Sequence, residues 1–229
     1  MPIFIIKNNP GLQNPIVFSE DDLRHIKKSL RVKLGEELLV TDNQGALAAF
    51  KVTALDPLCG ELGAVKTQVA PKDLTVCLPL IEQKNLEWAV QKLTELNVAK
   101  VQLLSTERTQ KNILSSAKWE RLLSVAENAQ KQCLRAYPLQ LQPVKALQEI
   151  KFSDFDFCVA GFIADHSQEL PRDLGQHQKI AVLVGPEGGF TDSEMSYLLE
   201  QGVVATNLGL TVLRSETAAI VLADRVLLH

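Results

Sequence analysis

Hydrophobic and polar positions after residue 70 follow alternating strand and helix patterns. The run Ile180-Ala181-Val182-Leu183-Val184 is apolar throughout, which is typical of a strand buried on both faces of a parallel sheet. Segment 82–97 instead repeats its apolar residues at helical spacing and predicts an amphipathic helix. Further strands are expected at 74–80, 101–104, 157–163 and 203–208, and further helices at 117–134, from about 192 and at 216–223. This order predicts an α/β domain with a parallel sheet.

Residues 1–70 have a different pattern. Short apolar stretches are separated there by turn-forming residues at 9–11, 42–45 and 56–57, and one short helix is expected from about Glu20 to Leu30. The pattern predicts a small β-barrel, joined to the α/β domain by a linker at 71–73. The sequence therefore divides into a barrel domain at 1–70 and an α/β domain at 74–229.

Composition narrows the class of protein. The chain has 229 residues, of which 46% are hydrophobic, enough for substantial cores. No apolar run approaches the roughly 20 residues that span a bilayer, and the start is too short for a signal peptide, so a cytoplasmic protein is expected. The cysteines and histidines lack the spacing of metal ligands, so neither a metal site nor disulfides are expected. The cysteines, Cys59, Cys77, Cys133 and Cys158, are expected to be small buried apolar groups.

The candidate chemistry lies in two turns that follow the last predicted strands. Glycines and a proline come directly after strand 180–184, and glycine lets the backbone approach a ligand closely. Thr191 and Glu194 then have the spacing of a capping box. A second turn follows at Gly209. Such turns occur at ordinary strand-to-helix junctions, but two of them at the carboxyl ends of strands predict a ligand site. Neither has a phosphate-loop pattern, so a dinucleotide or nucleoside triphosphate is not indicated.

Charge alone does not select a partner. The net charge of −3 argues against a general nucleic-acid binder, which needs clustered lysine and arginine. A local basic cluster nevertheless lies in and just beyond the helix expected at 20–30; it contains Arg24, Lys27, Lys28, Arg31 and Lys33. Acidic neighbours suit a solvated helix face, and the alternative is contact with RNA phosphates.

Several short blocks are distributed along nearly the whole chain. They are Gly185-Pro186-Glu187-Gly188-Gly189-Phe190, Leu208-Gly209, Leu213-Arg214-Ser215-Glu216-Thr217-Ala218, Lys92-Leu93-Thr94-Glu95-Leu96, Glu107-Arg108-Thr109, Gln132-Cys133-Leu134-Arg135 with Pro138, and His25 with Leu30-Arg31-Val32-Lys33-Leu34-Gly35. Together they resemble the RsmE family of SPOUT methyltransferases. The chain departs from that family at Lys131, where Glu is usual, at Asn97, where Gly is usual, and at Pro2, near an early position that is often basic.

The resemblance implies a fold, a reaction and a site. It implies a PUA-like barrel, a SPOUT α/β domain with a trefoil knot, a homodimer, and methylation by S-adenosylmethionine of N3 of a uridine in 16S ribosomal RNA of the small subunit. The implied cofactor-binding residues are Leu183, Val184, Gly185, Pro186, Glu187, Gly188, Leu208, Gly209, Leu210, Val212 and Leu213. The implied RNA contacts are Arg24, Lys27, Lys28, Arg31, Arg108 and Arg135. The apolar last helix suits either a subunit interface or an intrachain core.

Methylation at N3 of uracil requires loss of the N3 proton. Glu216 is the candidate base, and Arg214 is the candidate cation that stabilises the uracil anion. Glu216 has the alternative of a favourable interaction with the dipole of the helix it begins, or of support for the cofactor loops. Arg108 and Arg135 have the alternative of ordinary surface ion pairs.

Two other functions remain open. One is a related SPOUT methyltransferase that acts on transfer RNA, against which the amino-terminal barrel and the block Leu213–Ala218 both argue. The other is a non-catalytic ribosome-assembly factor that binds RNA, which Lys131 and the modest basic charge suggest.

Overall fold

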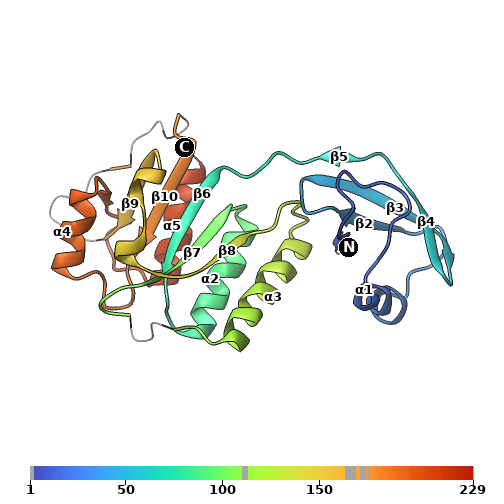
Figure 1. Cartoon of the computed structure of the whole chain (residues 1–229), viewed down its shortest axis with the longest axis horizontal. Coiled ribbons are helices and arrows are strands. Elements are labelled where there is room, and N and C mark those ends of the chain that lie inside the picture. Colours follow the sequence, from blue (N-terminus) through green and yellow to red (C-terminus); the bar gives the residue numbers. More distant parts are fainter. Residues whose placement is uncertain (1–2, 110–112, 163–168, 171–173, 175, 229) are drawn as a thin grey trace. The chain divides into compact units, whose positions relative to one another are not determined.

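The computed structural model describes residues 3–109, 113–162, 169–170, 174 and 176–228 (Figure 1). The chain forms two compact units. The first contains Met1–Ala70 and Gln130–Pro138, and the second contains Pro71–Ala129 and Leu139–His229.

The first unit is built on a five-stranded sheet. Its strands are β1 (Ile3–Ile5), β2 (Glu37–Thr41), β3 (Ala46–Leu55), β4 (Leu58–Leu62) and β5 (Lys66–Thr67), in the order β1-β2-β3-β4 with β5 paired to β3. β1 and β2 are parallel, and the other pairs are antiparallel. Phe50 and Val52 of β3 are buried while Lys51 between them is exposed, which is the alternation of a sheet with one face on the core.

The short helix expected near the basic cluster is present in two parts, α1 (Glu20–Arg24) and the π-helix η1 (His25–Leu30). The Ser19 hydroxyl accepts a hydrogen bond of 3.1 Å from the Asp22 N–H and so caps the first turn. Arg31 ends the second part in a left-handed conformation, with φ of 51°. A π-helix followed by a left-handed arginine is uncommon backbone, and such backbone is frequent at functional sites.

A segment from the middle of the chain completes the first unit. The Gln68 side chain accepts a hydrogen bond of 2.7 Å from the Ala136 N–H and donates one of 2.9 Å to the Leu134 carbonyl. These bonds join residues 68 and 66 positions apart, so no local pattern reveals them. The sequence-based division at 1–70 and 74–229 accordingly left this segment in the other domain.

The second unit contains the expected parallel sheet, which has six strands. They are β6 (Asp73–Pro79), β7 (Lys100–Ser105), β8 (Gln140–Ala146), β9 (Phe157–Gly161), β10 (Lys179–Val184) and β11 (Val204–Thr206), in the order β11-β9-β10-β6-β7-β8. In β10, residues 180–184 are at most 1% exposed. Burial on both faces is the reason this strand is apolar throughout.

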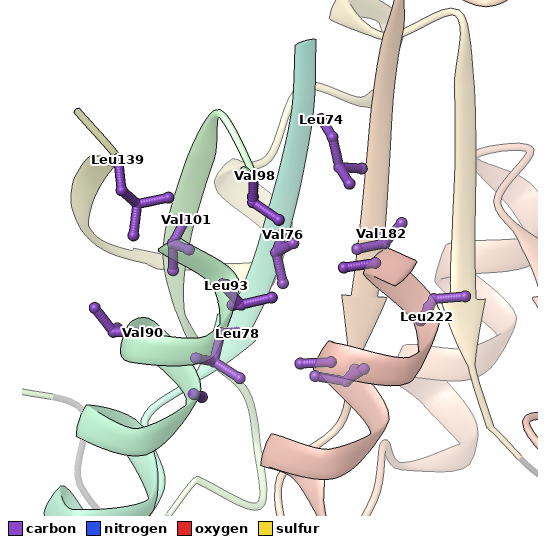
Figure 2. Close-up of a cluster of buried hydrophobic side chains, with 14 of the residues drawn as sticks. Leu74, Val76, Leu78, Val90, Leu93, Val98, Val101, Leu139, Val182 and Leu222 are labelled. Atoms are coloured by element: carbon purple, nitrogen blue, oxygen red, sulfur yellow. The ribbon is translucent and has the colours of Figure 1, made fainter. Parts of the chain in front are cut away.

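Helices supply the cover for both faces of this sheet. They are α2 (Gln83–Glu95), α3 (Ser116–Gln132), α4 (Asp192–Glu200) and α5 (Ser215–Leu227). Leu93 of α2 and Leu222 of α5 lie in one buried cluster with Val76 and Val182 of the strands (Figure 2). Alternate strand residues form a second cluster with Leu198 of α4. The sheet is thus the middle layer between two sets of helices, as in other α/β folds.

Strand β8 is the element that the hydrophobic pattern does not predict. It lies at the edge of the sheet, where Gln140 is exposed and Pro143 interrupts the ladder of hydrogen bonds. Proline is tolerated at an edge strand, and an edge strand needs no continuous apolar run. Two short 3₁₀ turns, η2 (Leu147–Glu149) and η3 (Phe152–Asp154), lead from β8 toward β9.

The expectation that every cysteine is buried is wrong for Cys59 and Cys133. Cys77 and Cys158 are buried, whereas Cys133 is partly buried and Cys59 is exposed on β4, at the edge of the first sheet. Within the described ranges, no helix is long and apolar enough to cross a membrane. In the same part of the chain, no group of three or more His, Cys, Asp or Glu side chains is placed to hold a metal ion. The trefoil knot implied by the resemblance stays a prediction.

Candidate active site

The loop after β10, residues 185–190, makes a tight turn and is called the glycine loop below. The Gly189 N–H donates a hydrogen bond of 2.8 Å to the Pro186 carbonyl, and Gly189 has φ of 70°. A Cβ atom at Gly185 would lie 3.0 Å from the Phe190 backbone nitrogen. Glycine is therefore required at 189 by conformation and favoured at 185 by close packing.

The glycine loop leads into α4 through the expected capping box, which is confirmed. Thr191 Oγ1 accepts a hydrogen bond of 3.2 Å from the Glu194 N–H, and the Glu194 carboxylate accepts one of 2.9 Å from the Thr191 N–H. The other Glu194 oxygen accepts a hydrogen bond of 2.8 Å from the Glu107 N–H. Glu194, which is 2% exposed, therefore starts the helix and also anchors the turn that follows β7.

Arg108 extends from that turn onto the glycine loop. Its Nη1 donates hydrogen bonds of 2.7 Å to the Gly188 carbonyl and 3.2 Å to the Phe190 carbonyl. A Cβ atom at Gly188 would lie 3.2 Å from Arg108 Cδ, so the absence of a side chain at 188 lets the arginine pass. The structure therefore places Arg108 against the glycine loop, whereas the sequence interpretation made it an RNA contact.

The second loop, residues 207–214, follows β11. Asn207 Oδ1 accepts a hydrogen bond of 3.0 Å from the Gly209 N–H, and Arg225 of α5 donates one of 2.9 Å to the Leu208 carbonyl. Leu210 and Val212 are 106% and 83% exposed. Leu208 and Leu213 are partly buried against the core, so these polar contacts and the packing of its two end leucines together hold this bend.

The first residues of α5 connect the two loops. Ser215 Oγ donates a hydrogen bond of 2.7 Å to the Gly185 carbonyl, and Ser215 is 4% exposed. Glu216 is 7% exposed, and its carboxylate has no hydrogen bond or ion pair with another residue in the described part of the chain. Arg214 occupies the N-cap position and is exposed.

Both loops line a cavity of about 770 Å³ beyond the carboxyl ends of the strands. Open α/β sheets bind ligands at this position, and the volume lies within the roughly 300–1,000 Å³ of small-molecule sites. The residues selected from the sequence that line it are Val184, Gly185, Pro186, Glu187, Gly188, Leu208, Val212, Leu213, Arg214 and Glu216.

Three of the residues selected for the cofactor do not line the cavity, and their role in binding the cofactor stays a prediction. Leu183 is 0% exposed and packs in the core cluster on the α4 side, because side chains alternate along a strand. The side chain of Leu210 is exposed to solvent. Gly209 has no side chain that could extend toward the cavity.

The cavity also contains residues that the sequence reasoning missed. Glu82 and Asn85 come from the start of α2, which follows β6 and so begins at the same edge of the sheet. The rule that places ligands at carboxyl strand ends could have found them. The lining carboxylates, which are Glu82, Glu187, Asp192 and Glu216, outnumber Arg214, so the cavity favours a positively charged ligand.

The basic cluster of the first unit is partly neutralised. Arg24 and Lys27 each pair with an aspartate, and the Lys27 pair has a distance of 3.1 Å. Lys28 and Arg31 are exposed and have no ion pair within the residues that the structure describes. Of the arginines and lysines selected in this unit, these two are the most available to an anion.

Arg135 does not have the exposure that the sequence interpretation expected. It is 5% exposed, and its Nη2 donates a hydrogen bond of 3.4 Å to the Pro138 carbonyl. Burial lowers the pKa of the Arg135 guanidinium to about 10, so the group is still charged at neutral pH. A phosphate contact requires a guanidinium at the surface, so this burial does not favour the RNA contact expected at Arg135, which stays a prediction.

Comparison with known protein families shows which family the chain belongs to. The sequence model of the RNA methyltransferase domain family matches residues 68–227. The chain belongs to this family. The model of an RNA methyltransferase PUA domain matches residues 18–58, which lie in the first unit and confirm the PUA-like prediction.

Other members of the RNA methyltransferase family resemble this chain over most of its length. The ribosomal RNA small subunit methyltransferase E of Aquifex aeolicus is 28% identical over 227 residues, which covers 96% of each chain. The protein of the same name from Bacillus subtilis is 24% identical over 86% of this chain and 84% of its own. The crystal structure of ribosomal RNA small subunit methyltransferase E from Neisseria gonorrhoeae, bound to S-adenosyl methionine, is 23% identical and aligns with a TM-score of 0.83 over 98% of this chain and 96% of its own. The α/β fold is therefore shared with this family.

Proposed function

We propose that this protein transfers a methyl group from S-adenosylmethionine to N3 of a uridine in 16S ribosomal RNA of the small subunit. The observation that carries the proposal is the cavity formed by the glycine loop and the second loop in a chain of the RNA methyltransferase family. The names of the relatives from Aquifex aeolicus and Bacillus subtilis support the choice of small-subunit ribosomal RNA.

The residues that line the cavity fit S-adenosylmethionine. Gly185 and Gly188 bring bare backbone to the cavity wall, where a Cβ atom would crowd neighbouring atoms. Because carboxylates outnumber arginines in the cavity lining, the cavity favours binding of the positively charged sulfonium of this cofactor. The bound cofactor would supply an electrophilic methyl group, so the protein chiefly has to orient the donor and the uracil. The cofactor would be held on one side by residues 184–188, at the end of β10 and in the glycine loop. On the other side it would be held by residues 208, 212 and 213 of the second loop.

Glu216 has the position expected of the group that takes the N3 proton. Glu216 lines the cavity and is 7% exposed as a residue, and no described side chain forms a hydrogen bond or ion pair with its carboxylate. A carboxylate without a partner is free to accept a hydrogen bond from the uracil N3–H and then its proton. Arg214, which lies beside it on the cavity wall, would stabilise the negative charge that develops on the uracil oxygens.

The first unit is proposed to bind the RNA. Lys28 and Arg31 are the basic side chains most available to phosphates, and the left-handed backbone at Arg31 fixes the direction in which its side chain leaves the π-helix. Arg24 and Lys27 would first have to exchange their aspartates for phosphates. The domains proposed are 1–70 for RNA binding and 74–229 for catalysis, with the segment 130–138 of the latter range packed into the first unit.

Assembly and location are part of the same proposal. Leu228 is 78% exposed just after α5, and Leu210 and Val212 are exposed beside the cavity, so a homodimer would bury apolar surface there. Sedimentation of the protein over a range of micromolar concentrations tests the homodimer. A protein that sediments as a monomer throughout this range would contradict it. A protein that acts on ribosomal subunits is expected in the cytoplasm.

The decisive experiment identifies the methylated nucleoside. The protein is incubated with labelled S-adenosylmethionine and either unmethylated small subunits, free 16S RNA or transfer RNA, and digested RNA is read by mass spectrometry. We expect N3-methyluridine in small-subunit RNA. Label in transfer RNA would favour the related SPOUT methyltransferase. Calorimetric titration with S-adenosylhomocysteine separates the non-catalytic alternative, since a protein without a cofactor site would give no heat.

A further inference from the structure

We infer that Arg108 is a positioning residue, which holds the glycine loop in its cofactor-binding shape rather than contacting RNA. The inference rests on the proposed function, because it explains how the proposed cofactor site is formed before the ligand arrives. It is carried by a rigid turn, by the docking of that turn on α4, and by two hydrogen bonds to the glycine loop.

The turn that bears Arg108 is itself rigid. The Thr106 N–H donates a hydrogen bond of 3.0 Å to Thr109 Oγ1, and the Thr109 N–H donates one of 3.1 Å to the Thr106 carbonyl. The two hydroxyl oxygens lie 2.9 Å apart, and both threonines are at most 7% exposed. Hydrogen bonds in both directions between the two buried threonines fix the backbone from which the arginine extends.

The turn is docked on the start of α4. Glu194, at 2% exposure, accepts the hydrogen bond from the Glu107 N–H, and Ser193 Oγ donates one of 3.2 Å to the Glu107 carboxylate. The glycine loop ends where α4 begins, so the base of the Arg108 side chain and the end of the loop are held to the same point.

Arg108 then fixes the carbonyls of the two residues that flank Gly189. Both carbonyls that it binds, those of Gly188 and Phe190, flank the one loop residue with a left-handed φ. Bonds from a charged donor are stronger than those between neutral groups. A loop already held in shape loses less conformational freedom when it binds a ligand, so the arginine should strengthen cofactor binding without touching the cofactor.

The geometry also explains why RNA is the weaker assignment for Arg108. Its Nη1 is committed to backbone carbonyls of its own unit, and its stem lies against Gly188. A phosphate would have to compete with those bonds. RNA contact is therefore the outcome that would overturn the inference.

The experiment compares R108M, R108K and R121M in the full-length protein. Methionine keeps the apolar stem of the arginine but removes its donors. Lysine keeps the charge but not the planar donor group. R121M is the matched control, because Arg121 lies on α3 and pairs with Glu87 at 3.2 Å, outside the glycine loop. Each variant is measured for S-adenosylhomocysteine affinity, for affinity to small-subunit RNA without cofactor, and for amide hydrogen exchange at residues 188–191 without ligand.

R108M should weaken S-adenosylhomocysteine binding by about tenfold, the effect of losing roughly 1.4 kcal/mol of hydrogen bonding. It should speed amide exchange in the glycine loop and leave RNA affinity within about twofold of the wild type. R108K should fall between R108M and the wild type, and R121M should match the wild type. Loss of RNA affinity with unchanged cofactor affinity, or unchanged exchange in R108M, would overturn the inference.

Failure of the proposed function gives a different result. If the wild-type protein shows no heat with S-adenosylhomocysteine, the cofactor assignment fails, whereas the exchange comparison of R108M with the wild type still decides whether Arg108 braces the loop. A second variant, G188A, tests the packing of Gly188 against the arginine stem. Its Cβ would lie 3.2 Å from Arg108 Cδ, so loop exchange should rise in G188A and rise less when the stem is already removed by R108A. If the increases in loop exchange caused by the two replacements simply add in the double variant, the contact between Gly188 and Arg108 is not supported.

Discussion

Ser215 Oγ lies 2.7 Å from the carbonyl oxygen of Gly185, and this hydrogen bond ties the start of α5 to the start of the glycine loop. Arg108 binds the same loop at Gly188 and Phe190, so the loop is held at both ends by side chains from other parts of the second unit. The cavity wall is consequently a preformed surface, which is the arrangement that catalysis by orientation requires.

Replacement of Ser215 by alanine should destabilise the second unit. The Gly185 carbonyl, which is partly buried, would lose this donor, which costs about 1 kcal/mol of unfolding free energy. S215T keeps the hydroxyl and is the matched control. Urea denaturation measures the loss, and calorimetry should show weaker S-adenosylhomocysteine binding in S215A than in S215T. Equal stability of S215A and the wild type would show that the bond contributes little.

Replacement of Glu216 by glutamine should separate catalysis from cofactor binding. Glutamine has a similar shape but cannot accept the uracil N3 proton, so kcat should fall by about 10²–10⁴ while S-adenosylhomocysteine affinity changes little. E200Q, at an exposed position at the end of α4, is the control. A fall in cofactor affinity with preserved kcat would instead assign Glu216 to support of the loops.

Stability should fall in alkaline solution because of a buried thiol. Burial raises the pKa of the Cys77 thiol from 9.0 to about 12, and the nearby Cys158 adds to the increase. The stabilising contribution is therefore complete below pH 9 and is lost as the pH rises toward 12, since the unfolded chain releases its proton first. The loss is about 1.4 kcal/mol per pH unit for this group. Urea denaturation from pH 8 to pH 10 should show a shallower dependence in C77A, and identical slopes would refute the assignment.

The surface carboxylate of Asp156 should instead make the protein less stable as the pH falls. The backbone N–H groups of Lys179 and Gln178 donate hydrogen bonds to the Asp156 carboxylate and hold its pKa below the ordinary value of 3.8. This contribution is present above pH 3.8 and is lost as the pH falls through the lowered pKa. D156N should therefore be less stable than the wild type at pH 7, and the difference should shrink near pH 2. A difference that does not change with pH would mean that the charge of Asp156 is irrelevant.

Much of the second unit could be predicted because its signals are local. The apolar run of β10 follows from burial on both faces, and the capping box joins Thr191 to a residue three positions away. The position of the ligand cavity follows from strand ends in a parallel sheet. Edge strand β8 was missed because its residues meet solvent and carry no strong pattern. The burial of Leu183 and the exposure of Leu210 could not be predicted, because exposure depends on which neighbours cover a side chain.

The amino-acid order was sufficient for the buried strands of the second unit, the capping box of α4 and the glycine loop, since each depends on periodicity or on neighbours within a few residues. Only the folded chain revealed that Ser215 and Arg108 hold that loop, because they lie 30 and 80 positions from the carbonyls of Gly185 and Gly188. The same holds for the segment at 130–138, which joins the first unit through Gln68. Contacts of this kind arise from how whole elements pack, and no short window of sequence encodes them.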